Sequence, residues 1–164
     1  MDDCCRNPTR IECEIIKAVQ RALHGKLLGR RERTVRIKSE LYDLGYRHNY
    51  NVWGVPSQQE PGWLWDLMWL KREGTLQEAN LRIKEIYLVC EIEWNTNEGE
   101  LLWDFLKLTV CDAPVRLFIF SETNPERIDR KFKMLVKASP ASRDFKYLAI
   151  CVCGDGRLET RAWA

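Results

Sequence analysis

The sequence predicts an α/β fold, with a central mixed β-sheet flanked by helices on both faces. Two observations support this prediction. Several short runs are apolar at every position, as in strands that are buried on both faces of a sheet. Amphipathic segments with helical spacing lie between these runs, so that each can cover one face. The 164 residues, of which 45% are hydrophobic and 30% charged, suit a single domain covering residues 1–164.

The first half of the chain predicts two helices followed by a hairpin. A capping box, Thr9-x-x-Glu12, begins an amphipathic stretch that ends at Gly25. A basic linker follows, and a turn-rich segment at 56–62 separates two strand-like runs. The expected elements are, in order, helices at 10–24 and 35–44 and strands at 50–55 and 63–70.

The second half predicts alternating strands and helices. Asn124 and Pro125 are typical of the N-cap and first position of a helix, and Asp155-Gly156 favours a hairpin turn. The last strand is expected at the edge of the sheet. The expected elements are strands at 86–94 and 115–120, helices at 98–110 and 124–137, and strands at 145–153 and 158–163.

The composition argues against a membrane, secreted or zinc protein. No run approaches the roughly 18 apolar residues of a membrane span, and the N-terminus does not resemble a signal peptide. The seven cysteines are odd in number and scattered, and neither histidine lies near a cysteine pair with zinc-site spacing. We therefore expect reduced thiols and a cytoplasmic protein.

Three acidic residues fall where core residues are expected. Glu91 and Glu93 are two apart at the end of an apolar strand, so both side chains should point to one face. Asp66 lies in the middle of a strand that is apolar on both sides. Carboxylates that converge in a buried place are unfavourable unless a cation lies between them. Oxygen ligands at an open site favour Mg²⁺ or Mn²⁺ over zinc.

The order helix, three strands, helix, strand, with these acids, resembles the PD-(D/E)xK nuclease superfamily, which has the restriction-endonuclease-like fold. The matching segments are Trp65-Asp66-Leu67-Met68-Trp69 and Val89-Cys90-Glu91-Ile92-Glu93-Trp94. The resemblance implies an αβββαβ core at about 10–121 and a C-terminal helix and hairpin extension at 122–164. It also implies that Asp66, Glu91 and the backbone carbonyl of Ile92 bind the metal.

The chain departs from the family pattern at Glu93, where the family usually has lysine. Some restriction enzymes of this fold carry Glu at that place. Lys107, in Asp104-Phe105-Leu106-Lys107 on the following helix, is a candidate for a lysine that has moved. Glu14, on the first helix, matches the place where many members carry an additional acid, which makes it a further candidate metal ligand.

A basic segment at 26–38 is the candidate nucleic-acid contact, although a solvated helix face explains it equally well. Trp53 and Trp94, near strand ends, are candidates for stacking on a base, with core packing as the favoured interpretation. The basic residues of the segment are Lys26, Arg30, Arg31, Arg33, Arg36 and Lys38.

The expected function is Mg²⁺-dependent hydrolysis of phosphodiester bonds in DNA. Asp66 and Glu91 would bind the ion, and Glu93 or Lys107 would orient and deprotonate water. The alternative is a catalytically inactive nuclease-fold module that binds nucleic acid or a protein. In simpler interpretations Asp66 ends a strand, the two glutamates form an ordinary polar face, and Lys107 is solvated or pairs with Glu93. A homodimer is compatible with cutting both strands.

Overall fold

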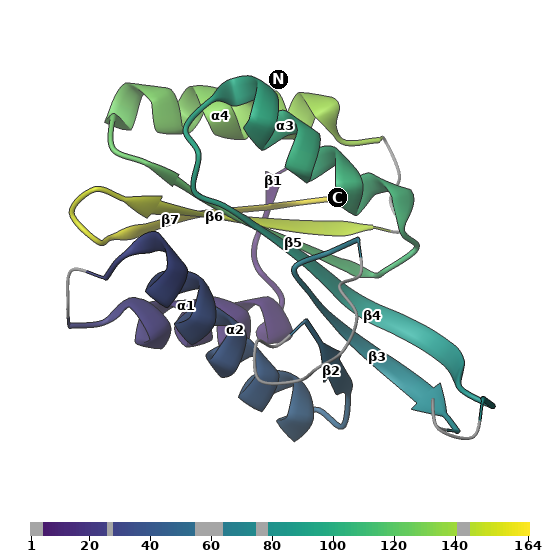
Figure 1. The fold of residues 1–164 in the computed structure, drawn as a ribbon. Coiled ribbons are helices and arrows are strands. Elements are labelled where there is room, and N and C mark those ends of the chain that lie inside the picture. Colours follow the sequence, from purple (N-terminus) through teal and green to yellow (C-terminus); the bar gives the residue numbers. More distant parts are fainter. Residues whose placement is uncertain (1–4, 26–27, 55–63, 75–78, 141–144) are drawn as a thin grey trace.

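The computed structural model describes residues 5–25, 28–54, 64–74, 79–140 and 145–164. These residues form one seven-stranded mixed sheet with the strand order β1-β7-β6-β5-β4-β3-β2 (Figure 1). The strands are β1 (Cys5–Arg6), β2 (Asn51–Trp53), β3 (Leu67–Glu73), β4 (Arg82–Glu93), β5 (Val115–Glu122), β6 (Lys146–Cys153) and β7 (Leu158–Trp163).

Two layers of helices enclose the sheet, which confirms the predicted α/β class. Helices α1 (Arg10–Leu23) and α2 (Arg30–Arg47) cover one face, and α3 (Glu98–Lys107) and α4 (Pro125–Ala138) cover the other (Figure 1). Strands β2, β3 and β4 form an antiparallel meander, and β5 and β6 then run parallel to β4. The predicted order of helix, three strands, helix and strand is therefore present.

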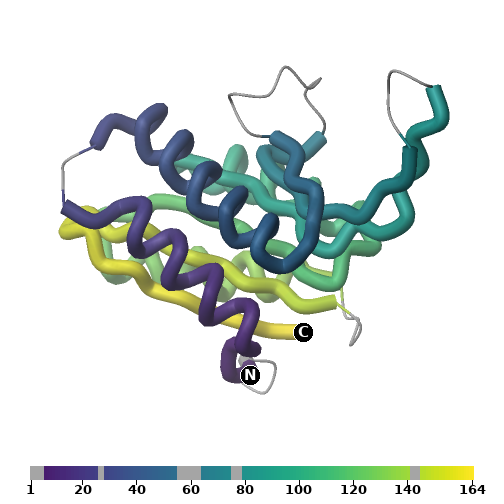
Figure 2. The backbone as a smooth tube through the Cα atoms, turned by 90° about the horizontal axis from the view of Figure 1, so that it is seen from below, coloured from purple at the N-terminus to yellow at the C-terminus, as the bar shows by residue number. Residues whose placement is uncertain are grey.

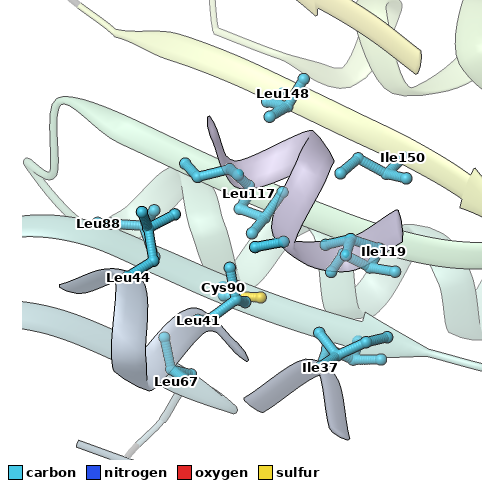
Figure 3. Close-up of a cluster of buried hydrophobic side chains, with 14 of the residues drawn as sticks. Ile37, Leu41, Leu44, Leu67, Leu88, Cys90, Leu117, Ile119, Leu148 and Ile150 are labelled. Carbon is cyan, nitrogen blue, oxygen red and sulfur yellow. The ribbon is translucent and has the colours of Figure 1, made fainter. Parts of the chain in front are cut away.

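The core beneath α1 and α2 is mostly aliphatic, with Trp69 and Trp94 as its buried aromatic residues. Helix α2 places Ile37, Leu41 and Leu44 on one side, and they face buried side chains of β3, β4, β5 and β6 (Figure 3). Helix α1 lies beside α2 across the same face (Figure 2). Its inward stripe follows helical spacing, as the sequence predicted, and comprises Ile15, Ala18, Val19 and Ala22.

The core beneath α3 and α4 is aromatic. Phe105 of α3 packs edge-on against Phe118 of β5, and Phe132 of α4 does the same with Phe120. Tyr147 of β6 stacks on Trp163 at 5.4 Å between ring centroids. The predicted capping of α4 is confirmed, because the Asn124 side chain accepts a hydrogen bond from the amide of Glu126, with Pro125 in the first turn.

Helix α2 is longer than predicted. It begins at Arg30, so the last five residues of the segment expected as a basic linker, 30–34, form about its first one and a half turns. Arginine and glutamate are good helix formers, and Arg36 pairs with Glu32 one turn earlier at 2.9 Å. The sequence offered no hydrophobic stripe there, which is why the start of the helix was placed too late.

The second strand of the predicted hairpin begins later than expected. Strand β3 starts at Leu67, so Trp65 and Asp66 precede it, and the prediction of Asp66 inside a strand is wrong. The expected turn at 56–62 lies outside the described residues. Strand β4 begins at Arg82, four residues earlier than expected, and β3 and β4 extend as a long antiparallel arm (Figure 1).

The predicted C-terminal extension is part of the central sheet. Strand β6 pairs with β5 along its whole length, from Val115↔Lys146 to Glu122↔Cys153. Strand β7 is not at the edge, because β1 pairs outside it. Helix α3 continues into a short 3₁₀ turn, Leu108–Val110. Within the described ranges, no helix has the length and apolar character needed to cross a membrane.

Candidate metal centre

Glu91 and Glu93 lie at the carboxyl end of β4, and both face α3. This confirms the prediction that they share a face. Glu91 contacts Lys107 of α3. Glu93 is hydrogen-bonded to Asp104, which lies about one helical turn before Lys107 on α3. Glu91 is buried, with 4% of its surface exposed, whereas Glu93 is half-buried. The end of β4 and the second half of α3 thus enclose a cluster of ionisable groups.

Lys107 is the cation of this cluster. Its Nζ lies 2.5 Å from Oδ1 of Asp104 and 3.4 Å from Oε2 of Glu91. The indole N–H of Trp65 donates to the backbone carbonyl of Lys107 at 2.9 Å, which ties the end of α3 to the segment before β3. Burial lowers the pKa of Lys107, but the hydrogen bond to Asp104 and the charge of Glu91 outweigh it, so the net pKa is raised.

Glu91 is poorly satisfied for a buried carboxyl group. Burial and then the negative charge of Asp66 raise its pKa from 4.5 to about 8, although Lys107 opposes the rise. Its Oε1 atom is buried without a hydrogen-bond partner among the described residues. Burial therefore favours the protonated form of Glu91, and a further cation at the unpartnered oxygen would favour the ionised form.

Asp66 lies immediately beside this end of β4. Strand pairing ends at Leu67↔Cys90, so Asp66 is one position past the ladder, level with Glu91. Its Oδ2 accepts the backbone N–H of Ile92 at 3.0 Å, and its Oδ1 lies 3.0 Å from Nζ of Lys38. Asp66 is thus near enough for its charge to raise the pKa of Glu91, but its side chain pairs with α2, whereas that of Glu91 pairs with α3 on the other face of the sheet. Convergence of the two carboxylates on one ion stays a prediction, and Asp66 comes from a bend and not from a strand.

Gly54 fixes the backbone of that bend. It follows β2 with φ +95°, a conformation that side-chain-bearing residues rarely adopt. A Cβ added at Gly54 would collide with the backbone carbonyl of Asp66. Gly54 has no predicted role, because no local sequence signal indicates that two segments 12 positions apart touch here.

Glu93 and Asp104 form a hydrogen-bonded pair of carboxyl groups whose pKa values shift in opposite directions. Burial and the hydrogen bond to Asp104 raise the pKa of Glu93. Burial acts in the same direction on Asp104, but its bonds to Glu93 and Lys107 hold the pKa of Asp104 below its usual value. The backbone N–H of Asn95 also donates to Glu93. Asp104 had no predicted role, although its position three residues before Lys107 placed both on one side of the helix.

Glu14 is not part of the cluster. Its carboxylate binds His48 at 2.8 Å and Arg10 at 3.3 Å. It lines a separate cavity of about 560 Å³ with Tyr87 of β4. Because Tyr87 lies four residues before Glu91, roughly 13 Å along the strand separates the two places. Glu14 is therefore not positioned as a ligand to an ion held by Glu91.

The predicted nucleic-acid contacts divide into exposed and engaged residues. Arg30 and Arg31 are exposed at the start of α2, whereas Lys38 is engaged by Asp66. Arg33 donates to the carbonyl of Leu28 at 3.0 Å and lies over the ring of Trp94. Arg36 pairs with Glu32, as noted above, and Lys26 lies outside the described residues.

The two tryptophans proposed for base stacking are packed in the core. Trp53 and Trp94 are both buried, and the indole N–H of Trp94 donates to the hydroxyl of Thr34 at 2.7 Å. Neither presents a ring face to solvent on which a base could stack. The favoured interpretation of these residues, core packing, matches their burial.

The donor set fits a magnesium ion better than a metal that needs a full protein cage. In the described part of the chain, no group of three or more His, Cys, Asp or Glu side chains is placed so that it could hold a metal ion. Mg²⁺ is usually bound through one or two carboxylates, with water and substrate phosphates completing its shell. Asp66 and Glu91 match that number of carboxylates; Oε1 of Glu91 is unpartnered, whereas the two oxygens of Asp66 are bonded to Lys38 and to the amide of Ile92.

The comparisons with known proteins identify no relatives. Neither the models of protein families, nor the curated proteins, nor the solved structures gave a significant match to this chain. The resemblance to the PD-(D/E)xK superfamily therefore remains a prediction from the sequence.

Proposed function

We propose that this protein is a Mg²⁺-dependent nuclease that hydrolyses phosphodiester bonds in DNA at the cluster of Asp66 and Glu91. One observation carries the proposal. Glu91 is a buried carboxyl group with a pKa of about 8 and an unpartnered oxygen, near enough to Asp66 for that negative charge to contribute to the raised pKa. Strongly perturbed acids that converge in this way are more common at functional sites than in structural ones.

A divalent cation would resolve the unfavourable electrostatics of this cluster. An ion with a charge of 2+ beside Asp66 and Glu91 would lower the pKa of Glu91 and bind its unpartnered oxygen. The Ile92 carbonyl, next to the amide that already binds Asp66, is a further proposed ligand. The ion would polarise the phosphate and acidify a bound water. Mn²⁺ has the same preference for oxygen ligands and is an alternative.

The residues of the chain then have separate roles in hydrolysis. Lys107, held by Asp104, orients the attacking water. The water oxygen bonds to phosphorus, and the ester P–O bond breaks. Glu93, in its ionised form, accepts one proton of the water. The leaving oxygen takes up a proton from solvent. Arg30 and Arg31, exposed at the start of α2, contact the DNA backbone.

The direct test is cleavage of plasmid DNA in the presence of Mg²⁺ or Mn²⁺. We expect Asp66→Ala and Glu91→Ala each to abolish cleavage without unfolding the protein. Glu85→Gln is a matched control, because Glu85 is a carboxylate on the same strand, β4, that pairs with Lys71 at 2.9 Å away from the cluster. Equal cleavage by the parent and both alanine variants would exclude this site.

A second candidate is an inactive nuclease-fold module that binds nucleic acid or a protein partner. Two ion pairs favour this candidate: Lys38 already pairs with Asp66, and Lys107 already pairs with Glu91. Such a protein would not need a metal ion to balance its charges. A rise in melting temperature with Mg²⁺, which is lost in Asp66→Asn, would argue against this candidate.

A further inference from the structure

Lys38 has an environment that is unusual for a lysine. Its side chain is only 12% exposed, and Asp66 is its only ion-pair partner among the described residues, at 3.0 Å. Ile37 and Leu41, both fully buried, hold this part of α2 against the sheet. The ammonium group is therefore held at the candidate metal ligand by a rigid helix.

Lys107 differs from Lys38 because it has two carboxylate partners, Glu91 and Asp104. If Glu91 turns to another cation, Lys107 keeps its 2.5 Å contact with Asp104. If Asp66 turns to another cation, Lys38 loses its only described counter-charge. A largely buried ammonium group without a partner is unfavourable, so Lys38 then requires a new anion.

We propose that Lys38 exchanges partners during the reaction, leaving Asp66 when this carboxylate binds Mg²⁺ and then binding the phosphate that is to be cut. This inference rests on the proposed nuclease function. It assigns to Lys38, on α2, the lysine that the chain lacks at Glu93. It also means that Lys38 competes with the metal in the free protein and assists the substrate in the complex.

The charges at the site balance under this exchange. Without metal, Lys38 neutralises Asp66. With metal, two positive charges come to Asp66 and Glu91, and the phosphodiester brings the negative charge that Lys38 needs. Arg31 lies seven residues earlier on the same side of α2, roughly 10 Å along the helix axis, and is exposed. A DNA backbone that runs along this side of α2 would contact Lys38 next to the metal ion and Arg31 nearer the start of the helix.

The experiment measures Mg²⁺ binding and DNA cleavage separately in Lys38→Met, Lys38→Arg and Asp66→Asn. Isothermal titration calorimetry with Mg²⁺ alone gives the affinity. In Lys38→Met we expect Mg²⁺ to bind roughly 3- to 10-fold more tightly, because a competing cation is gone. Cleavage should nevertheless fall by about 100-fold, and Lys38→Arg should recover part of it. Asp66→Asn should lose both.

Lys71→Met is the matched control, because Lys71 pairs with Glu85 on the β3–β4 arm at 2.9 Å. It should change neither measurement. Weaker Mg²⁺ binding together with a lower melting temperature in Lys38→Met would show that Lys38 is only structural. Wild-type cleavage by Lys38→Met would overturn the role of Lys38 alone. A wild-type protein that neither binds Mg²⁺ nor cuts DNA would overturn the nuclease proposal, and this inference with it.

Discussion

Two buried glutamates on neighbouring strands are each paired with a lysine from the following helix, but their surroundings differ. Glu122, at the end of β5, lies 2.7 Å from Lys131 of α4, and both side chains are nearly inaccessible, at 3% and 1% exposed. Glu122 also accepts the backbone amides of Thr123 and Asn124. These bonds outweigh burial and lower its pKa. Glu91 has a longer ion pair, no amide donor on Oε1 and a raised pKa.

The difference separates a structural ion pair from a candidate functional one. A buried ion pair is tolerated when its geometry is good and hydrogen bonds satisfy its remaining atoms. At Glu122 two amides bind Oε1 and Lys131 lies beside Oε2, although Oε2 and the Lys131 Nζ make no further hydrogen bond among the described residues. At Glu91 the same type of pair is incomplete, and the nearest additional charge, Asp66, is negative. Of these two ion pairs, only that of Glu91 is in such an unfavourable environment. This difference is the reason for assigning function to Glu91 and not to Glu122.

The largest expected effect is on stability at the structural pair. Glu122→Gln should lower the free energy of unfolding by about 3–5 kcal/mol, because it leaves the ammonium group of Lys131 buried without a counter-charge. Glu91→Gln should change it by less than about 1 kcal/mol at pH 7, since the raised pKa of Glu91 already favours its neutral form. Urea denaturation of both variants measures the contrast. Equal losses would remove the distinction between the two pairs.

The pH dependence of stability should also differ between the pairs. The folded pKa of Glu91, about 8, lies above its ordinary 4.5, so the folded state holds this proton more tightly. Stability from Glu91 is then fully present below pH 4.5 and is lost as pH rises to about 8, at up to roughly 1.4 kcal/mol per pH unit. Glu122, whose pKa is lowered, contributes stability that is lost as pH falls below its ordinary value.

Urea denaturation between pH 4 and pH 9 tests this prediction. Glu91→Gln should flatten the decline above pH 4.5 and leave the acid limb unchanged. A decline that persists in Glu91→Gln would mean that another group causes it.

The backbone support of the candidate site predicts a smaller loss. Gly54→Ala should lower stability by about 2–4 kcal/mol, because it combines a strained φ with a collision against the carbonyl of Asp66. Gly156→Ala is the matched control, since its φ is +84° but its added Cβ meets nothing within 4 Å. It should cost only about 1 kcal/mol. Similar losses in both variants would show that Gly54 does not position Asp66.

The smallest expected effect on stability is at Glu93. Glu93→Gln keeps an oxygen for the amide of Asn95 and removes one of two hydrogen-bonded carboxyl groups, Glu93 and Asp104. The change in unfolding free energy should stay within about 1 kcal/mol. If Glu93 is the proton acceptor of the proposed reaction, cleavage should fall by roughly 100-fold. Full activity would transfer that role to another group.

The sequence by itself determined the fold class and most of the elements. Helix α1, with its capping box and stripe, and helix α4, with Asn124 and Pro125, were predicted closely because caps and periodicity are local signals. Alternation along a strand also placed Glu91 and Glu93 on one face. The start of α2 and the bend at Asp66 were missed, since neither has an apolar period that marks it.

Only the tertiary structure decided which charges meet. Lys38 and Asp66 are 28 positions apart, and Glu91 and Lys107 are 16 apart, so packing of helices on the sheet sets these pairs and sequence spacing does not. The contrast between Glu91 and Glu122 has the same origin. Both are acids at the ends of apolar strands, and only the backbone amides and lysine around Glu122 make it structural. Burial is a property of the whole fold, and together with the nearby charge of Asp66 it gives Glu91 its raised pKa.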